Sequence, residues 1–200
     1  SLQFTYNVVD SANRMIIFIN YLKFELNITS NVFKNNDLIG SEFITLNHDI
    51  NEIAFINNTF SGITSAKTFE VFPTFLYFNR ITELESYLII CECKFINIQN
   101  EYSAIQVGSA SMTVNIKLNI TNSEFIDNHC TKGNGGAFSV KINHELSITN
   151  CHFKNNKAFH HGGAISLYMH TKVEIISCTF EENIANYDSS SFMHDLKKGK

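Results

Sequence analysis

Phenylalanine returns along this chain at intervals of 27 to 35 residues, inside a recurring frame of apolar and polar positions. The residues around it repeat as well, as in 151–156 (CHFKNN) and 178–183 (CTFEEN). A period of this size indicates stacked structural repeats, each packing on its neighbours. We take the recurring residue as position zero of the repeat and expect a continuous structural stack of Phe4, Phe33, Phe60, Phe95, Phe125, Phe153 and Phe180.

Two further apolar patterns accompany each phenylalanine. An apolar pair stands seven and five residues earlier, and its spacing of two is the strand period, so both members face one side. Another strand is predicted further on, most clearly at 135–140 (GGAFSV) and 162–167 (GGAISL). The apolar pairs are Leu26/Ile28, Ile53/Phe55, Leu88/Ile90, Leu118/Ile120, Leu146/Ile148 and Val173/Ile175.

Three short strands and three corners in each repeat predict an all-β fold. We predict that 1–200 is a single-domain right-handed parallel β-helix, a solenoid of about seven coils of 27–35 residues. A β-sandwich with Greek-key connections also has short alternating strands. A sandwich, however, does not reproduce the same Phe-x-x-Asn corner in unit after unit. We expect the chain to be a segment of a longer protein.

A small residue usually stands two positions before the phenylalanine, and in two adjacent repeats it is Cys151 and Cys178. Stacked coils would bring the Cα atoms of these cysteines to roughly 5 Å, within the range that a disulfide allows. The alternative, which we favour, is that the position requires a small inward residue, since free cysteine buries well. Because the chain has five cysteines, at least one has no partner in this segment.

Asparagine stands three positions after the phenylalanine in several repeats, including Asn128, Asn156 and Asn183. Asparagine tolerates the left-handed backbone conformation and can bond its own backbone, so we expect these residues to form tight turns.

Three Asn-x-Ser/Thr triplets are candidate glycosylation sites, at Asn27, Asn57 and Asn119. Asn27 and Asn119 share one repeat position between two inward apolar residues, so we expect both to point outward. Asn57 is expected at a bend, where it would also be accessible.

One repeat is longer than the others, with 35 residues between Phe60 and Phe95. Insertions in a solenoid emerge as loops on one face, often the binding face. A longer strand pair packing aromatic side chains is an equally good interpretation. The candidate binding-loop residues are Phe72, Pro73, Phe75, Tyr77 and Arg80.

Charge and composition exclude some functions. A net charge of −4 leaves no basic patch for nucleic acid, and no apolar run approaches the roughly 18 residues of a membrane span. Histidines gather in the C-terminal half, but the chain lacks zinc-site spacing, so we predict no metal and no cofactor. Carboxylates for a polysaccharide-cleaving site would have to come from Glu124, Asp127, Glu181 and Glu182, which form no evident cluster.

The Gly-Gly-Ala segments and the Phe-x-x-Asn tetrads at 125–128, 153–156 and 180–183 resemble the repeats of chlamydial polymorphic outer membrane proteins and related microbial or protist surface proteins. That resemblance implies a secreted or surface-displayed protein with a role in adhesion. We therefore expect a non-catalytic extracellular scaffold that associates with itself, with other surface or filament proteins, or with glycans. A polysaccharide-binding or pectate-lyase-like polysaccharide-cleaving β-helix is the alternative function.

Overall fold

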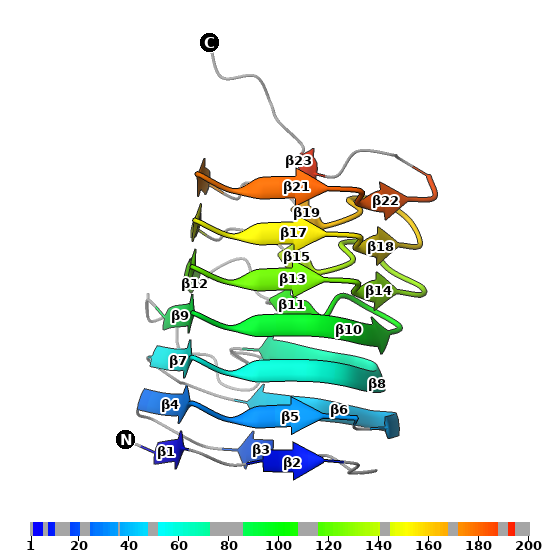
Figure 1. Ribbon diagram of the computed structural model, residues 1–200. Coiled ribbons are helices and arrows are strands. Elements are labelled where there is room, and N and C mark those ends of the chain that lie inside the picture. The colour runs from blue at the N-terminus through cyan, green and yellow to red at the C-terminus, as the bar shows by residue number, and fades with distance from the viewer. Residues whose placement is uncertain are drawn as a thin grey trace, which may run out of the picture.

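The computed structural model is a parallel β-solenoid and describes residues 2–5, 8–10, 17–20, 25–35, 37–47, 52–72, 86–107, 116–140, 145–167, 172–187 and 192–194. Within these ranges every regular element is a strand, and the paired strands run parallel to one another. The coils rise in chain order from the N-terminus to the C-terminus (Figure 1). The predicted all-β solenoid is therefore confirmed.

Among the described residues, one sheet has seven strands that follow one another up the stack. The apolar pairs of the sequence lie on these strands and face the core, where Leu88, Ile90, Leu118 and Ile120 are buried. In chain order the strands are β1 (Leu2–Thr5), β4 (Glu25–Thr29), β7 (Glu52–Ile56), β9 (Ser86–Cys91), β12 (Ile116–Thr121), β16 (Glu145–Thr149) and β20 (Lys172–Ile176).

The other sheet has 16 strands within the described ranges and contains several rows, which the long strands β6 and β8 connect. The row with the recurring phenylalanines consists of β2 (Val8–Asp10), β5 (Val32–Lys34), β8 (Thr59–Phe72), β10 (Lys94–Asn100), β13 (Glu124–Ile126), β17 (His152–Lys154) and β21 (Thr179–Glu181). Beside it lie β14 (His129–Cys130), β18 (Lys157–Ala158) and β22 (Ile184–Ala185). The remaining strands are β3 (Ile17–Asn20), β6 (Asp37–Asn47), β11 (Ile105–Val107), β15 (Phe138–Val140), β19 (Ile165–Leu167) and β23 (Phe192–His194).

About four turns, formed by β9–β11, β12–β15, β16–β19 and β20–β23, repeat the same arrangement in succession. In the last three of these turns the chain bends after the phenylalanine strand, so that β13, β17 and β21 are each followed by a separate two-residue strand (Figure 1). In the preceding turn, β10 passes through the same place as one continuous strand.

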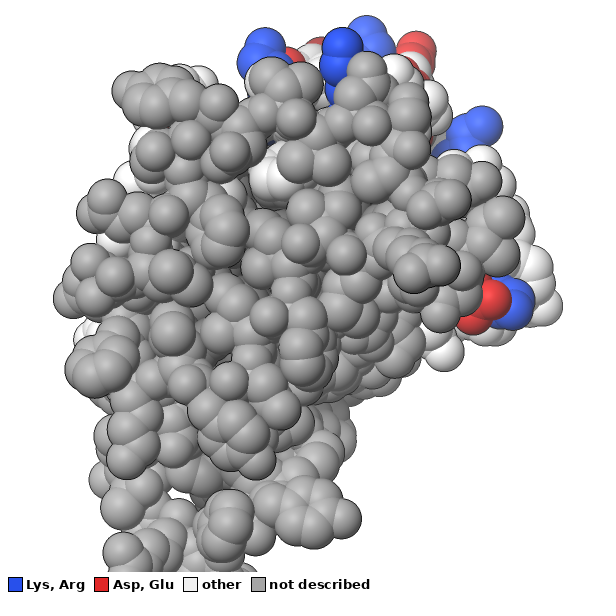
Figure 2. Space-filling view, turned by 90° about the horizontal axis from the view of Figure 1, so that it is seen from below, with Lys and Arg blue, Asp and Glu red and all other residues white. Residues whose placement is uncertain are grey.

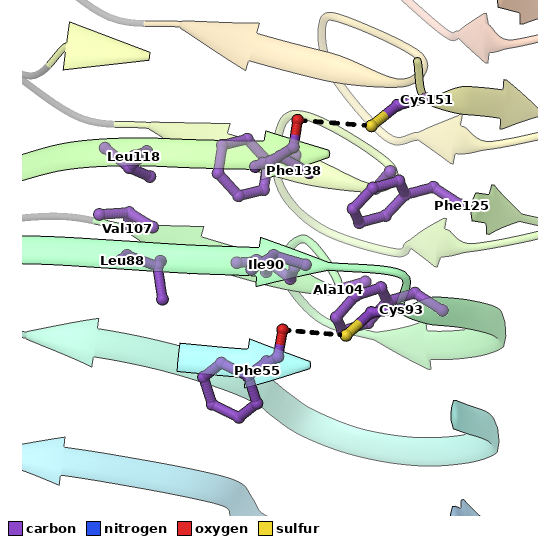
Figure 3. Close-up of a cluster of buried hydrophobic side chains, with 14 of the residues drawn as sticks. Phe55, Leu88, Ile90, Cys93, Ala104, Val107, Leu118, Phe125, Phe138 and Cys151 are labelled. Carbon is purple, nitrogen blue, oxygen red and sulfur yellow. Dashed lines mark hydrogen bonds between the residues drawn. The ribbon is translucent and has the colours of Figure 1, made fainter. Parts of the chain in front are cut away.

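The phenylalanine side chains form a column inside the solenoid. From Phe33 to Phe180, neighbouring ring centroids are 4.8–5.0 Å apart and the rings lie within 11° of parallel. Aromatic rings are large apolar groups whose contact adds to the burial energy. Figure 3 shows Phe125 beside the apolar side chains of the neighbouring sheets. The predicted stack is therefore present over this range.

Phe4 does not belong to that column, and its assignment from the sequence was wrong. In the strand register Phe4 pairs with Ile28, whereas Val9 is the residue that pairs with Phe33. The column that contains Ile28 also accepts phenylalanine, since Phe55 pairs with Ile28 one coil further on. Two inward columns that both accept phenylalanine cannot be distinguished by spacing alone.

The asparagines three positions after the phenylalanine are not the left-handed turn residues that we expected. Asn128, Asn156 and Asn183 are buried and form a hydrogen-bonded ladder along the solenoid. The left-handed residues stand one position earlier, as at Asp127 and Asn155, where φ is 57° and 53°. Because Asn128 and Asn156 point inward, they bond the next coil instead of the local turn.

The Gly-Gly-Ala segments combine two backbone requirements. Gly162 has a φ of +61°, which disfavours residues with a Cβ atom. A Cβ atom on Gly163 would lie 2.4 Å from the backbone nitrogen of Ile184 in the next coil. The first glycine therefore provides the turn and the second allows two coils to approach each other.

Seen from below, along the stack, the described charged side chains lie at the rim of the molecule (Figure 2). Basic and acidic side chains stand next to one another there. This arrangement agrees with the ion pairs of the outer surface, such as Lys94 with Glu124 at 3.3 Å. The rim therefore carries mixed charge in this view.

Candidate functional site

A polar groove runs along the outer surface where the phenylalanine strands meet the bend. Its first column consists of the residues two positions after each phenylalanine: Asn97, Asp127, Asn155 and Glu182. All four have positive φ, between 51° and 57°. Asparagine and aspartate are the non-glycine residues that most readily adopt this conformation, which explains three of these positions.

The second column of the groove stands four positions after each phenylalanine. Strand register aligns Gln99 with His129, His129 with Lys157, and Lys157 with Ile184. The two columns and the buried Asn128 line a groove of about 640 Å³. Four successive coils thus place polar side chains in parallel rows along the solenoid axis.

The charges of the groove nearly balance. Asp127 and Glu182 are acidic and Lys157 is basic, and all three side chains are exposed. Partial desolvation of the largely exposed His129 ring, with a further contribution from the nearby Lys157 ammonium, lowers the pKa of His129 below its usual value of about 6.5. The lowered pKa favours the neutral form of His129, so two carboxylates face one ammonium group.

The four carboxylates considered for catalysis do not converge. The Glu124 carboxylate lies 3.3 Å from Lys94 Nζ, and Glu181 lies 3.5 Å from Lys154 Nζ and 3.6 Å from His152 Nε2. Asp127 and Glu182 face the polar groove, but two coil steps separate them, roughly 10 Å of backbone. Among the described residues, these carboxylates therefore do not form a compact acid–base pair.

A second, smaller groove of about 300 Å³ lies over the outer face of the seven-stranded sheet. Tyr87, Lys117 and Glu145 follow one another in its strand register, and Lys117 Nζ lies 5.6 Å from the centre of the Tyr87 ring. That distance fits a cation–π contact. Asn119, one of the predicted glycosylation sites, also lines this groove and is exposed.

The structure places the three candidate glycosylation residues at the surface to different degrees. Asn57 and Asn119 are exposed, whereas Asn27 is half-buried. Strand register connects Asn27 through Ala54 and Ile89 to Asn119, so these residues form one column. The shared repeat position expected for Asn27 and Asn119 is thus present.

All five cysteines are free thiols in this structure. Cys151 and Cys178 are stacked as expected, and the Cys151 backbone N–H donates to Cys178 Sγ at 3.4 Å without a disulfide. Cys93 Sγ lies 3.3 Å from the carbonyl oxygens of both Phe55 (Figure 3) and Cys91, which share its single S–H donor. Burial raises the pKa of the Cys93 thiol to about 11 and that of Cys151 to about 12.

Thiol reactivity should separate these cysteines. Because the thiolate is the reactive form, native protein treated with iodoacetamide at pH 8 should be modified at the half-buried Cys91 before Cys93 and Cys151. Peptide mass spectrometry after timed quenching measures the order. Denatured protein, in which all five thiols are exposed, is the control, and equal labelling rates in the native state would contradict the burial of Cys93 and Cys151.

Most of the candidate binding loop lies outside the described residues. Phe72 is the last residue of β8, and Pro73, Phe75, Tyr77 and Arg80 lie outside the described residues.

Within the described ranges, no group of three histidine, cysteine or acidic side chains is arranged to hold a metal ion. His160 and His161 lie in a small aromatic group with Phe159 and Tyr187, where the His160 and Tyr187 ring centroids are 5.3 Å apart.

The described part of the chain contains no helix long and apolar enough to span a membrane.

Most of the polar groove was not predicted from the sequence. Asn97, Gln99 and Lys157 were not candidate site residues, and His129 stood only among the histidines of the C-terminal half, although polar residues recur two and four positions after the phenylalanine. That recurrence was the available signal. It is weak because outward positions of any solenoid are commonly polar.

No protein-family model, no curated protein and no solved structure matches this chain. The functional assignment therefore depends on the residues and their geometry.

Proposed function

We propose that this chain is part of an extracellular or cell-surface structural rod, a right-handed parallel β-helix of about seven coils that acts in adhesion or assembly and not in catalysis. The observation that carries the proposal is the continuity of the inward columns. The phenylalanine column runs through six residues at 4.8–5.0 Å, and buried asparagines continue from coil to coil. Such columns suit a rigid spacer that carries variable outer side chains. The seven strands of the first sheet, which follow one another in chain order, support the proposed number of about seven coils.

The C-terminal edge of the described stack favours addition of another coil, and we propose that a second copy of the chain supplies it. Strands β20 and β21 have a described neighbour on one side only. Val173, Ile175 and Phe180 on these strands are only partly buried against the core. Parallel strand edges with exposed apolar residues are templates for further pairing.

Light scattering coupled to size-exclusion chromatography tests this assembly. The proposal predicts a mass that rises with protein concentration in whole multiples of one chain. Val173→Lys should prevent growth, because it places a charge at the apolar edge. Lys172→Ala, a change of an exposed side chain on the same strand, should leave growth unaltered. A single monomeric species at all concentrations would contradict the proposal.

Glycosylation tests the extracellular part of the proposal independently. In native material from a eukaryotic secretory route, at least one of Asn27 and Asn119 should carry a glycan, because the two residues share an outward column. Glycopeptide mass spectrometry with and without enzymatic deglycosylation provides the measurement. Unmodified peptides at both positions would count against the proposed location.

A further inference from the structure

The polar groove repeats its hydrogen-bonding groups at the spacing of the coils. Asn97, Gln99 and Asn155 each carry a side-chain amide, which both donates and accepts hydrogen bonds. Hydroxyl groups have the same dual capacity, so these amides, together with the carboxylate, imidazole and ammonium groups of the same two columns, suit a ligand that presents hydroxyls at regular intervals. We propose that this groove binds a linear, uncharged oligosaccharide that lies along the solenoid axis. Glycan binding in this groove is a function additional to the structural one proposed above.

The length of the groove supports a polymeric ligand. Its first column extends over three coil steps, from Asn97 to Glu182, and the phenylalanine spacings over the same coils correspond to roughly 14–15 Å. The volume of about 640 Å³ lies within the usual range of ligand sites. A ligand in this direction meets outward side chains at the same two repeat positions in every coil, so a chain of units is favoured over a compact molecule.

The strand pairing argues against an extended peptide as the ligand. A peptide that binds by adding a strand needs an unpaired sheet edge. Here β13 is paired with both β10 and β17, and β14 with both β10 and β18. The backbone hydrogen-bonding groups along the middle of the groove are therefore already used, and recognition depends on side chains.

The charges argue against a polyanion. Asp127 and Glu182 stand at two levels of the groove, Lys157 is the basic residue lining it, and the lowered pKa of His129 favours the neutral form of its ring. Uronate, sulfated or nucleic-acid chains would meet a small excess of negative charge. At one end, the exposed Ile184 provides apolar surface suited to the C–H face of a sugar ring.

Isothermal titration calorimetry with defined oligosaccharides tests the proposal on the full chain. The neutral probes are cellohexaose, chitohexaose and mannohexaose, and the acidic probe is hexagalacturonic acid. We expect at least one neutral hexamer to bind, and to bind more tightly than its trimer, because the longer chain contacts more coils. Hexagalacturonic acid should bind more weakly than that neutral hexamer.

A double variant connects binding to the groove. Gln99→Ala with His129→Ala removes two exposed outward side chains and should weaken binding about tenfold or more. Lys94→Ala, an exposed change on the same strand β10 but outside the groove, should bind as the unmodified protein does. Circular dichroism and thermal midpoints confirm that both variants are folded.

The proposal is overturned if none of the three neutral hexamers binds, if the acidic hexamer binds equally well or better, or if the double variant retains full affinity. None of these results would affect the assembly or glycosylation tests, so failure of the glycan site remains distinguishable from failure of the structural proposal.

Discussion

Replacing Asn156 with alanine is expected to lower the free energy of unfolding by about 3–5 kcal/mol. The Asn156 side chain is fully buried, and its Nδ2 donates to the Phe125 carbonyl and to Asn183 Oδ1, both at 2.9 Å. Its Oδ1 accepts from the backbone N–H and from Nδ2 of Asn128, at 3.1 and 2.9 Å. Truncation therefore leaves buried polar groups of Phe125, Asn128 and Asn183 without their hydrogen bonds to the Asn156 side chain.

Chemical denaturation followed by far-ultraviolet circular dichroism measures this loss. The matched control is Asn155→Asp, one residue away, because Asp127 already occupies the equivalent position of the preceding coil with a φ of 57°. The control should change stability by less than about 0.5 kcal/mol. A loss below about 1 kcal/mol for Asn156→Ala would indicate that the buried ladder contributes little to the fold.

Phe125→Ala is expected to cost about 3–5 kcal/mol as well. The Phe125 ring is fully buried, with ring centroids of Phe95 and Phe153 at 4.9 and 4.8 Å on its two sides. Removing it deletes both stacking contacts and opens a cavity between coils whose backbone pairing prevents them from closing the gap. The same denaturation experiment provides the measurement.

Two further variants define the cause of that loss. Phe125→Leu retains much of the apolar volume and should cost only about 1–2 kcal/mol. Glu124→Ala removes a neighbouring outward side chain whose ion pair with Lys94 is exposed to solvent, and it should cost at most about 1 kcal/mol. Equal losses for the alanine and leucine variants would show that cavity volume is not the determining factor.

The sequence predicted the solenoid well because inward positions obey strict physical demands. An apolar pair at a spacing of two and a phenylalanine in each coil must bury on the same side, and Ile120 and Phe125 are indeed fully buried. For the position two residues before the phenylalanine, the sequence predicted only a small residue. Cys93 and Ser123 are small, but their shared role is donation to the carbonyl two residues earlier, at 3.3 and 2.8 Å. Asn31 and Asn58 make the equivalent bond.

The incorrect predictions and the missed groove share one cause, which is that the same residue type suits more than one position in the coil. Phe4 was placed in the wrong column because two inward columns accept the same residue type. Asn156 was assigned to a turn because asparagine suits both a left-handed bend and a buried ladder, and only the register of adjacent coils distinguishes these roles. The polar groove was overlooked because outward positions tolerate many polar residues, so no single one is diagnostic.

The sequence by itself therefore determined the repeat, the strand class and the identity of most core residues, because these depend on periodic burial. Only the tertiary structure decided which asparagines bond across coils and that Asn97, Asp127, Asn155 and Glu182 align in one groove. These outcomes depend on the register between residues about 30 positions apart, which is set by the packing of complete coils and not by any local pattern.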